Sequence, residues 1–189
     1  MMYKQQFPII LASKSPRRHE LLKLMGLDFT IELKDVDESY PADLIPSEIA
    51  VYVAVQKAKA FGNVPGKIVI TSDTIVALNG EILGKPNDRA HAKEMLKMLS
   101  GNKHEVYTGV ALVKEDVIHS FYDVTEVFCR EVNDEEIDFY IDNFKPFDKA
   151  GSYGIQDYWG VAVVQRINGS YTNVMGLPTE KLLDELKRL

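Results

Sequence analysis

An apolar run in the middle of the chain is the feature that most constrains the fold. Residues 67–73 carry Ile68, Val69 and Ile70 in succession, without the apolar and polar alternation that marks a half-exposed strand. Such a run is typical of a central strand that is buried on both faces. Ser72-Asp73-Thr74 follows it. The sequence therefore predicts a sheet whose central strand delivers polar side chains at its end.

The segments on either side predict helix-linked strands together with hairpins. A strand at 8–12 leads into a helix with Ser15 as N-cap, Pro16 at its first position and Gly26 at its end. Asn79-Gly80 is a hairpin signal between residues 75 and 83. Further strands are expected at 29–36, 105–113, 117–132 and 161–167, and further helices at 47–61, 88–99, 133–143 and 178–189. This mixture predicts an α/β or α+β fold on an elongated mixed sheet.

Length and composition limit the classes of protein. The 189 residues suit a single domain, 1–189, within which two closely packed lobes would also fit. The net charge of −6 argues against nucleic-acid binding, which depends on clustered cations. Residues 1–10 are too short an apolar stretch for a signal peptide, and no run approaches the roughly 20 apolar residues of a membrane span. We therefore expect a cytoplasmic protein without nucleic-acid or membrane partners, in which Cys129 is a buried, inert thiol.

The turn from Ser13 to Arg18 is the first candidate for chemistry. A helix N-terminus presents free backbone N–H groups, and Arg17 and Arg18 add forked donors for phosphate oxygens. Alternatively, both arginines are solvated residues of the first helical turn. Cations are unfavourable at that end of a helix, which favours an anionic partner, but the pattern alone leaves both interpretations open.

Carboxylates form the second candidate set. Ligands of open α/β sheets gather at strand ends, where Asp73 could hold a metal or take a proton from water. An equally simple role for Asp73 is to cap the backbone that follows it. The acidic run Asp35, Asp37 and Glu38 offers hard oxygen ligands for Mg²⁺ or Mn²⁺, shared with Asp73 and substrate phosphates. Most acidic runs, however, are simply solvated.

Three lysines, Lys57, Lys85 and Lys149, are candidate cations for an anionic ligand, although solvent is the default for Lys57. Other kinds of site are excluded. Residues 62–67 lack the spacing of a P-loop, the histidines show no metal spacing, and no Gly-x-Ser-x-Gly elbow exists. A hydrolase of this sequence would therefore use a metal and carboxylates rather than Ser-His-Asp chemistry.

Taken together, these segments resemble the Maf family of nucleoside triphosphate pyrophosphatases, also known as septum formation inhibitor homologues. The matching stretches lie in order along the chain at 11–18, 20–22, 72–76, 80–86, 95–96, 99–101, 148–156, 167–171 and 174–178. The resemblance implies a fold similar to that of the inosine triphosphate pyrophosphatases, with two lobes flanking a cleft, and frequently a homodimer.

The resemblance also implies an activity and roles for individual residues. It implies hydrolysis of a nucleoside triphosphate to the monophosphate and pyrophosphate with a divalent cation, Mg²⁺ or Mn²⁺. Asp73 matches the family's proton acceptor, which would activate water, and Glu38 matches its acidic partner near the metal. The phosphate-side residues of the family correspond to Ser13, Arg18, Lys57 and Lys85.

Arg17, Thr74 and Gln156 match the family's dTTP/UTP branch, which indicates a pyrophosphatase for dTTP and UTP that also removes modified pyrimidine nucleotides. The carboxamide of Gln156 offers a donor and an acceptor, which suits the neutral imide edge of uracil or thymine. The sequence departs from the family at Ser72, where Ala is common, and at Asp157, where Gly is common. Asp157 adds a charge beside the expected base reader. The alternative function is a nucleotide-sensing regulator of cell division without essential turnover.

Overall fold

The computed structural model describes residues 4–189. Met1–Tyr3, part of the apolar stretch that is too short for a signal peptide, lie outside the described residues. Within residues 4–189 the chain forms a seven-stranded mixed sheet in the order β2-β1-β3-β5-β6-β7, with β4 paired to β3 off this path. The strands are β1 (Ile9–Leu11), β2 (Phe29–Ile31), β3 (Val64–Leu78), β4 (Glu81–Leu83), β5 (Lys103–Glu115), β6 (Val117–Cys129) and β7 (Val164–Asn168).

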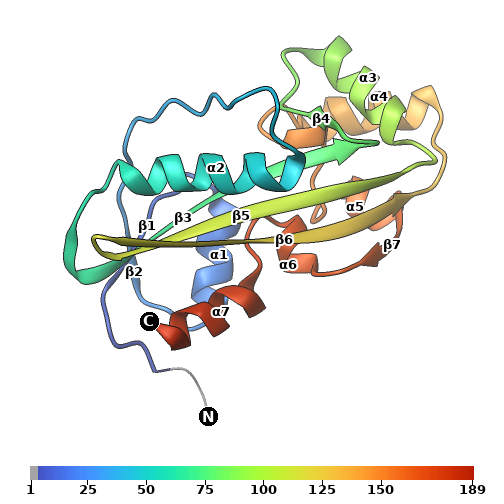
Figure 1. The fold of residues 1–189 in the computed structure, drawn as a ribbon. Helices are drawn as coiled ribbons and strands as arrows, with labels where there is room; N and C mark the ends of the chain where they lie inside the picture. The colour runs from blue at the N-terminus through green and yellow to red at the C-terminus, as the bar shows by residue number, and fades with distance from the viewer. Residues whose placement is uncertain (1–3) are drawn as a thin grey trace.

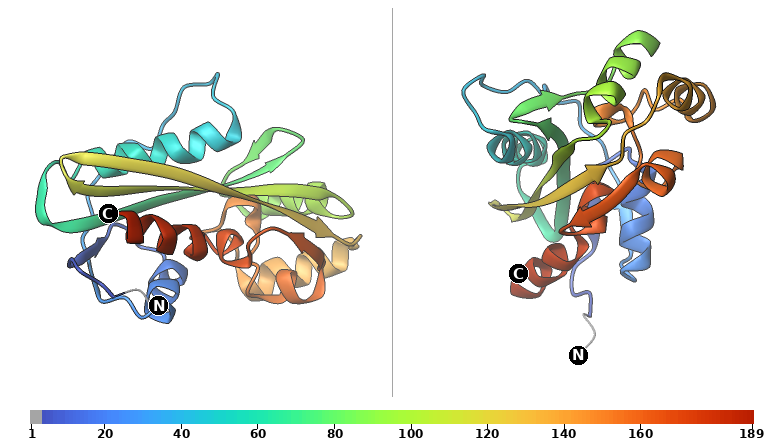
Figure 2. Two further views of the ribbon diagram at one scale, coloured as in Figure 1. Left: turned by 60° about the horizontal axis from the view of Figure 1, so that its bottom comes forward. Right: turned by 90° about the vertical axis from the view of Figure 1, so that its right-hand side faces the viewer.

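Helices cover both faces of this sheet. They are α1 (Pro16–Leu24), α2 (Pro46–Lys59), α3 (Arg89–Leu99), α4 (Asp134–Phe144), α5 (Tyr158–Ala162), α6 (Tyr171–Val174) and α7 (Thr179–Arg188), with a 3-10 turn η1 (Ala150–Ser152). Strands β3, β5 and β6 run the length of the molecule, with α1, α2 and α7 around one end and α3, α4 and α5 around the other (Figures 1 and 2). Among the described residues, every helix is too short or too polar to cross a bilayer. The predicted elongated mixed sheet with flanking helices is confirmed.

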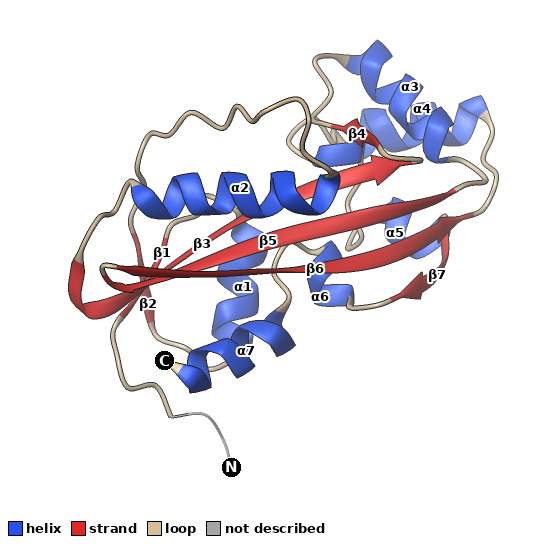
Figure 3. Cartoon of the chain, viewed as in Figure 1, coloured by secondary structure: helices blue, strands red, loops and turns tan. Residues whose placement is uncertain are grey.

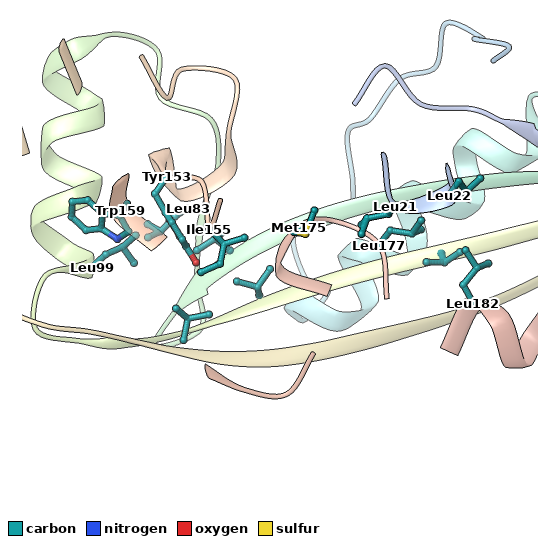
Figure 4. Close-up of a cluster of buried hydrophobic side chains, with 14 of the residues drawn as sticks. Leu21, Leu22, Leu83, Leu99, Tyr153, Ile155, Trp159, Met175, Leu177 and Leu182 are labelled. Carbon is teal, nitrogen blue, oxygen red and sulfur yellow. The ribbon is translucent and has the colours of Figure 1, made fainter. Parts of the chain in front are cut away.

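The central strand β3 is buried on both faces, as the apolar run predicts. Ile68 and Ile70 belong to the larger core, which includes Leu22 of α1. Val69 points the other way and packs in a second cluster with Ala54 of α2. Figure 4 shows the larger core, which reaches along the sheet from the leucines of α1 to Trp159 of α5.

Several element boundaries differ from those expected. The strand predicted at 29–36 ends at Ile31, and an exposed loop, residues 32–45, runs beside α2 (Figure 3). The strand predicted at 161–167 begins only at Val164, because Asp157 caps the short helix α5, which contains Val161. Strand β3 also continues without interruption through Thr74 to its hairpin with β4, whereas the sequence divides this segment into two elements.

Helix α2 lies unusually close to the sheet at Gly109 of β5, the residue paired with Asp73. A Cβ added at Gly109 would lie only 2.2 Å from the carbonyl oxygen of Ala50. One turn farther along α2, the carbonyl oxygen of Ala54 accepts a 2.7 Å hydrogen bond from the hydroxyl of Thr71. Gly109 and Thr71 together fix the height of α2 above the part of β3 that carries Asp73.

Gly109→Ala should therefore destabilise the protein by about 1–3 kcal/mol, the usual cost of overpacking, because the backbone of α2 must move away. Urea unfolding measures this change in the free energy of unfolding. Gly84→Ala is the matched control, since a Cβ at Gly84 meets no atom within 4 Å. Equal stabilities for the two variants would contradict the role assigned to this close approach.

Candidate active site

The site lies where one edge of β3 changes its partner. β1 pairs with this edge at Ile68–Ile70, and β4 pairs with it at Val76–Leu78. Between these points, residues 71–75 have no strand partner on this edge among residues 4–189, while β5 pairs continuously along the other edge. A cleft of about 550 Å³ opens at this gap. Such switch points are where open α/β sheets bind their ligands.

The cleft collects most of the residues that the sequence singles out. Its walls come from the turn before α1, the loop after β2, α2, the open edge of β3, and the segments 148–155 and 174–176. The expected site residues that line it are Ser13, Arg17, Arg18, Glu38, Lys57, Asp73, Thr74 and Lys85. Gln156 is exposed and is not part of the lining.

Asp73 points toward α2 and meets a lysine. The Lys57 ammonium lies 2.9 Å from Asp73 Oδ1 and 3.1 Å from Oε1 of Glu38, which stands on the loop after β2. Lys57 and Asp73 are only 18% and 20% exposed, whereas Glu38 is 58% exposed. Three separate elements thus bring one cation and two carboxylates together at the edge of the cleft.

Thr74 points to the opposite face of β3, where it meets Arg18. The guanidinium donates to the carbonyl oxygens of Gly176 (2.8 Å) and Ser72 (3.0 Å) and to Thr74 Oγ1 (3.0 Å). The Thr108 hydroxyl donates to a backbone carbonyl, so the Thr74 hydroxyl donates to Thr108 Oγ1 at 3.0 Å. Arg18 therefore ties α1 to β3 and to the 174–176 wall, and most of its five donors are directed at protein acceptors.

Ser13 organises the turn that precedes α1. Its hydroxyl oxygen accepts hydrogen bonds from the Ser15 backbone N–H (3.2 Å) and from Arg18 Nη1 (3.3 Å). Ser15 is the N-cap residue and Pro16 begins the helix, as expected, but the Ser15 side chain makes no capping hydrogen bond. The hydroxyl that holds this turn is that of Ser13.

Three further candidate cations, Arg17, Lys85 and Lys149, also line the cleft. Arg17 Nη1 lies 4.0 Å from Oδ2 of Asp148, and Lys149 Nζ lies 2.7 Å from Oδ1 of the same carboxylate. Lys85 lines the cleft from the segment after β4. Positive groups thus face the cleft from the α1 side and from the 148–155 side, which suits a polyanionic ligand.

Asp157 does not project into the cleft beside Gln156. Its two carboxylate oxygens share the single O–H donor of Tyr140, each 3.0 Å from the phenol oxygen, and Oδ1 also accepts a bond from the Trp159 backbone N–H. Burial raises the pKa of Asp157, and burial also raises the pKa of Tyr140. The Tyr140 hydroxyl in turn accepts a bond from the backbone N–H of Gly154, a cleft residue. Asp157 therefore supports the cleft wall through Tyr140, which links its carboxylate to Gly154.

Sequence reasoning missed the roles of Tyr140, Asp148 and Gly176. Asp148 and Gly176 lie in the stretches 148–156 and 174–178 that match the family, yet the candidates in the first stretch are Lys149 and Gln156 and the second stretch supplies none. The Gly-Leu-Pro step at 176–178 was a signal for a fixed turn, and Gly176 adopts a positive φ of 109°. Nothing in the periodicity of α4 distinguishes Tyr140, because its hydroxyl finds Asp157 only after folding.

The donor set suits a divalent cation that shares its ligands with a substrate. Within residues 4–189 no cluster of three or more His, Cys, Asp or Glu side chains could hold a metal ion alone. Glu38 and Asp73 nevertheless converge on one cationic group, the Lys57 ammonium. Carboxylate oxygens are what Mg²⁺ and Mn²⁺ prefer, and Mg²⁺ commonly uses one or two carboxylates together with substrate phosphates.

The fold and the cleft together define a mixed α/β protein whose candidate ligand site is lined by charged side chains. This site lies where one edge of β3 changes its partner strand. The structure resembles that of a HAM1 protein from Coxiella burnetii with a TM-score of 0.54 at 18% identity, covering 97% of this chain and 100% of the other. That likeness concerns the fold alone. The chain belongs to the Maf family, because the family model described as Maf-like protein matches residues 8–189.

Relatives of this chain carry a more specific name. A Bacteroides thetaiotaomicron protein named dTTP/UTP pyrophosphatase is 48% identical over 187 residues, 97% of each chain. A Bacillus anthracis protein of the same name is 51% identical over 181 residues, 95% of this chain and 94% of its own. The family resemblance seen in the sequence is confirmed.

A buried histidine behind the cleft predicts a pH dependence of stability. His104 Nε2 lies 2.7 Å from the hydroxyl of Tyr153, a cleft residue, and burial lowers the pKa of His104 from 6.5 to about 4. The imidazole of His104 therefore binds a proton more tightly in the unfolded chain than in the folded one. The contribution of the neutral His104 to the free energy of unfolding is fully present above pH 6.5 and is lost as the pH falls toward 4.

Acidification across that window should cost up to roughly 3 kcal/mol through His104 alone. Urea unfolding at several pH values measures it, and His104→Gln should flatten the profile between these pH values. An identical slope in wild type and His104→Gln would refute the assignment.

Proposed function

We propose that this chain is a nucleoside triphosphate pyrophosphatase that hydrolyses dTTP and UTP to the monophosphate and pyrophosphate, and that modified pyrimidine triphosphates are further substrates. The observation that carries the proposal is the meeting of Asp73, Glu38 and Lys57 in a cleft flanked by other cations. The relatives named dTTP/UTP pyrophosphatase, which match nearly the whole chain, support the same activity.

The chemistry proposed for the site is an in-line displacement at the α phosphorus. Asp73 orients a water molecule and accepts its proton as the water oxygen bonds to the α phosphorus. The bond from that phosphorus to the α,β-bridging oxygen breaks, and pyrophosphate leaves with the electron pair. Lys57 and Lys85 stabilise the negative charge on the phosphates. Arg18, whose donors mostly bind protein groups, adds positive charge and holds the wall in place.

Glu38 and Asp73 are the residues that would hold Mg²⁺ or Mn²⁺ together with phosphate oxygens. A divalent cation at this position supplies Lewis-acid polarisation of the phosphate oxygens and neutralises part of the triphosphate charge. The convergence of both carboxylates on one ammonium group supports this position for a cation.

Replacing Asp73 tests the activity. Asp73→Asn should lower kcat for dTTP and UTP by at least about a hundredfold, because the amide cannot accept the proton. Pyrophosphate release with saturating Mg²⁺ or Mn²⁺ measures the loss. Asp37→Asn, which changes an exposed carboxylate one residue from Glu38, is the matched control and should retain turnover. Full turnover by Asp73→Asn would eliminate Asp73 as the proton acceptor.

The pyrimidine preference is proposed to depend on Arg17, Thr74 and Gln156. Arg17 and Thr74 line the cleft, and Gln156 directly follows the cleft residue Ile155. Gln156 is exposed, so contact with a base requires the ligand to extend to the rim of the cleft. The Thr74 hydroxyl is engaged by Arg18 and Thr108, so its proposed contribution to the preference is to hold this wall in place rather than to contact the base.

Gln156→Glu and Arg17→Ala should change the order of preference among dTTP, UTP, CTP and purine triphosphates by about tenfold, while kcat for the best substrate stays within a few fold. The order of preference is measured as the ratio of kcat/KM values for these triphosphates in each variant and in wild type. Equal losses on every nucleotide would show that the two residues do not read the base.

Assembly and location complete the proposal. We propose that residues 1–189 act as one Maf-like domain, that two copies form a homodimer, and that the protein works in the cytoplasm on free nucleotides rather than on nucleic acid. The net charge of −6 supports the last point, since nucleic acid repels a negatively charged protein.

The alternative function is a nucleotide-sensing role without turnover. It predicts binding of dTTP but no release of pyrophosphate.

A further inference from the structure

The Lys57 ammonium occupies the one point on which the two proposed metal ligands converge. It lies 2.9 Å from Asp73 Oδ1 and 3.1 Å from Glu38 Oε1, so each carboxylate gives an oxygen to the same cationic group. Lys57 stands on α2, which Thr71 and Gly109 hold against the sheet. The ammonium is mostly shielded from water, so this ion pairing is more than a mobile surface contact.

A lysine ammonium and a divalent cation compete for these two carboxylates. Lys57 contacts one oxygen of each, Asp73 Oδ1 and Glu38 Oε1, and a divalent cation held between the same carboxylates would lie close to the ammonium and repel it. A metal ion that takes both carboxylates as ligands in the free protein therefore displaces Lys57, which then loses both of its carboxylate partners inside the cleft. Breaking such a pair without a replacement partner is costly for a shielded charge.

A nucleoside triphosphate removes this obstacle. Lys57 lines the same cleft as Lys85, and its flexible four-carbon stem lets the ammonium turn from the carboxylates to phosphate oxygens. The phosphates then compensate Lys57, while Glu38 and Asp73 become free to bind a cation. Binding of the nucleotide thereby frees the carboxylates for the cation, and binding of the cation frees Lys57 for the phosphates.

We propose that Lys57 is the resident counter-ion of Glu38 and Asp73, and that it keeps the divalent cation from binding until nucleotide phosphates draw its ammonium away. This inference rests on the proposed function for the identity of the nucleotide. Lys57 thus has two successive partners, the carboxylates in the free protein and the phosphates in the complex. By linkage, the cation and the nucleotide bind with positive coupling.

Binding of Mn²⁺ to the nucleotide-free, full-length protein tests the proposal, with electron paramagnetic resonance used to measure free Mn²⁺. Lys57→Met should bind Mn²⁺ about tenfold or more tightly than wild type, because the competing cation is gone. Lys57→Arg should bind as weakly as wild type. Lys59→Met is the matched control, since it removes an exposed lysine from the same helix and should leave the affinity unchanged.

Three outcomes overturn the proposal. The first is a Mn²⁺ affinity of Lys57→Met no higher than that of wild type, and the second is an equal gain in Lys59→Met, which would indicate a general charge effect. The double variant Lys57→Met/Asp73→Asn should lose the gain, and retention of the gain, the third outcome, would place the ion elsewhere. Thermal unfolding without metal checks that each variant is folded, and Lys57→Gln replaces Lys57→Met if it is not. The measurement needs no turnover, so it stands apart from a failure of the proposed pyrophosphatase activity.

Discussion

The structure depends on the way in which β3 is shared among its neighbours. One edge pairs with β5 almost throughout, and this gives the molecule its length. The other edge is divided between β1, which runs parallel to β3, and β4, which turns back from it in a hairpin. Five residues between these partners remain open on that edge, and the cleft opens there. The strand is therefore both the centre of the core and the floor of the site.

On this strand, the neighbouring residues Asp73 and Thr74 point to opposite faces of the sheet. Asp73 faces α2 and meets Lys57 and Glu38, whereas Thr74 faces α1 and meets Arg18. The first group is partly open to the cleft, because the Glu38 side chain is 58% exposed. The second is satisfied by protein acceptors, including the carbonyls of Ser72 and Gly176, and serves to join elements distant in the sequence. The cleft thus has one wall held by hydrogen bonds to protein acceptors and another that carries an ion-paired cluster.

Sequence patterns predicted the parts of this arrangement that local chemistry determines. The apolar run predicted the central strand, Asn79-Gly80 predicted the hairpin, and the family stretches contain most of the residues that line the cleft, although not Glu38 or Lys57. Contacts made only after folding could not be anticipated. Arg18 was expected to bind phosphate but turns toward backbone carbonyls, and Asp157 was expected to place charge beside Gln156 but binds Tyr140. The strand at 29–36 ended early for a similar reason: residues 32–34 find no burial, and the loop they begin carries Glu38 to the cleft.

The opposite orientation of Asp73 and Thr74 makes the site sensitive to strand register. Side chains alternate between the faces of a strand, so a slip of one residue in the pairing of β3 with β5 would turn the whole strand over. Thr74 would then face Lys57, and Asp73 would lie against Arg18 in the interior. Gly109 fixes which face of β5 lies against α2, because only a residue without a side chain fits beneath Ala50, and the continuous pairing of β3 with β5 then places Asp73 on the same face. Gly109, which is not among the residues that line the cleft, thus helps to determine whether Asp73 or Thr74 faces Lys57.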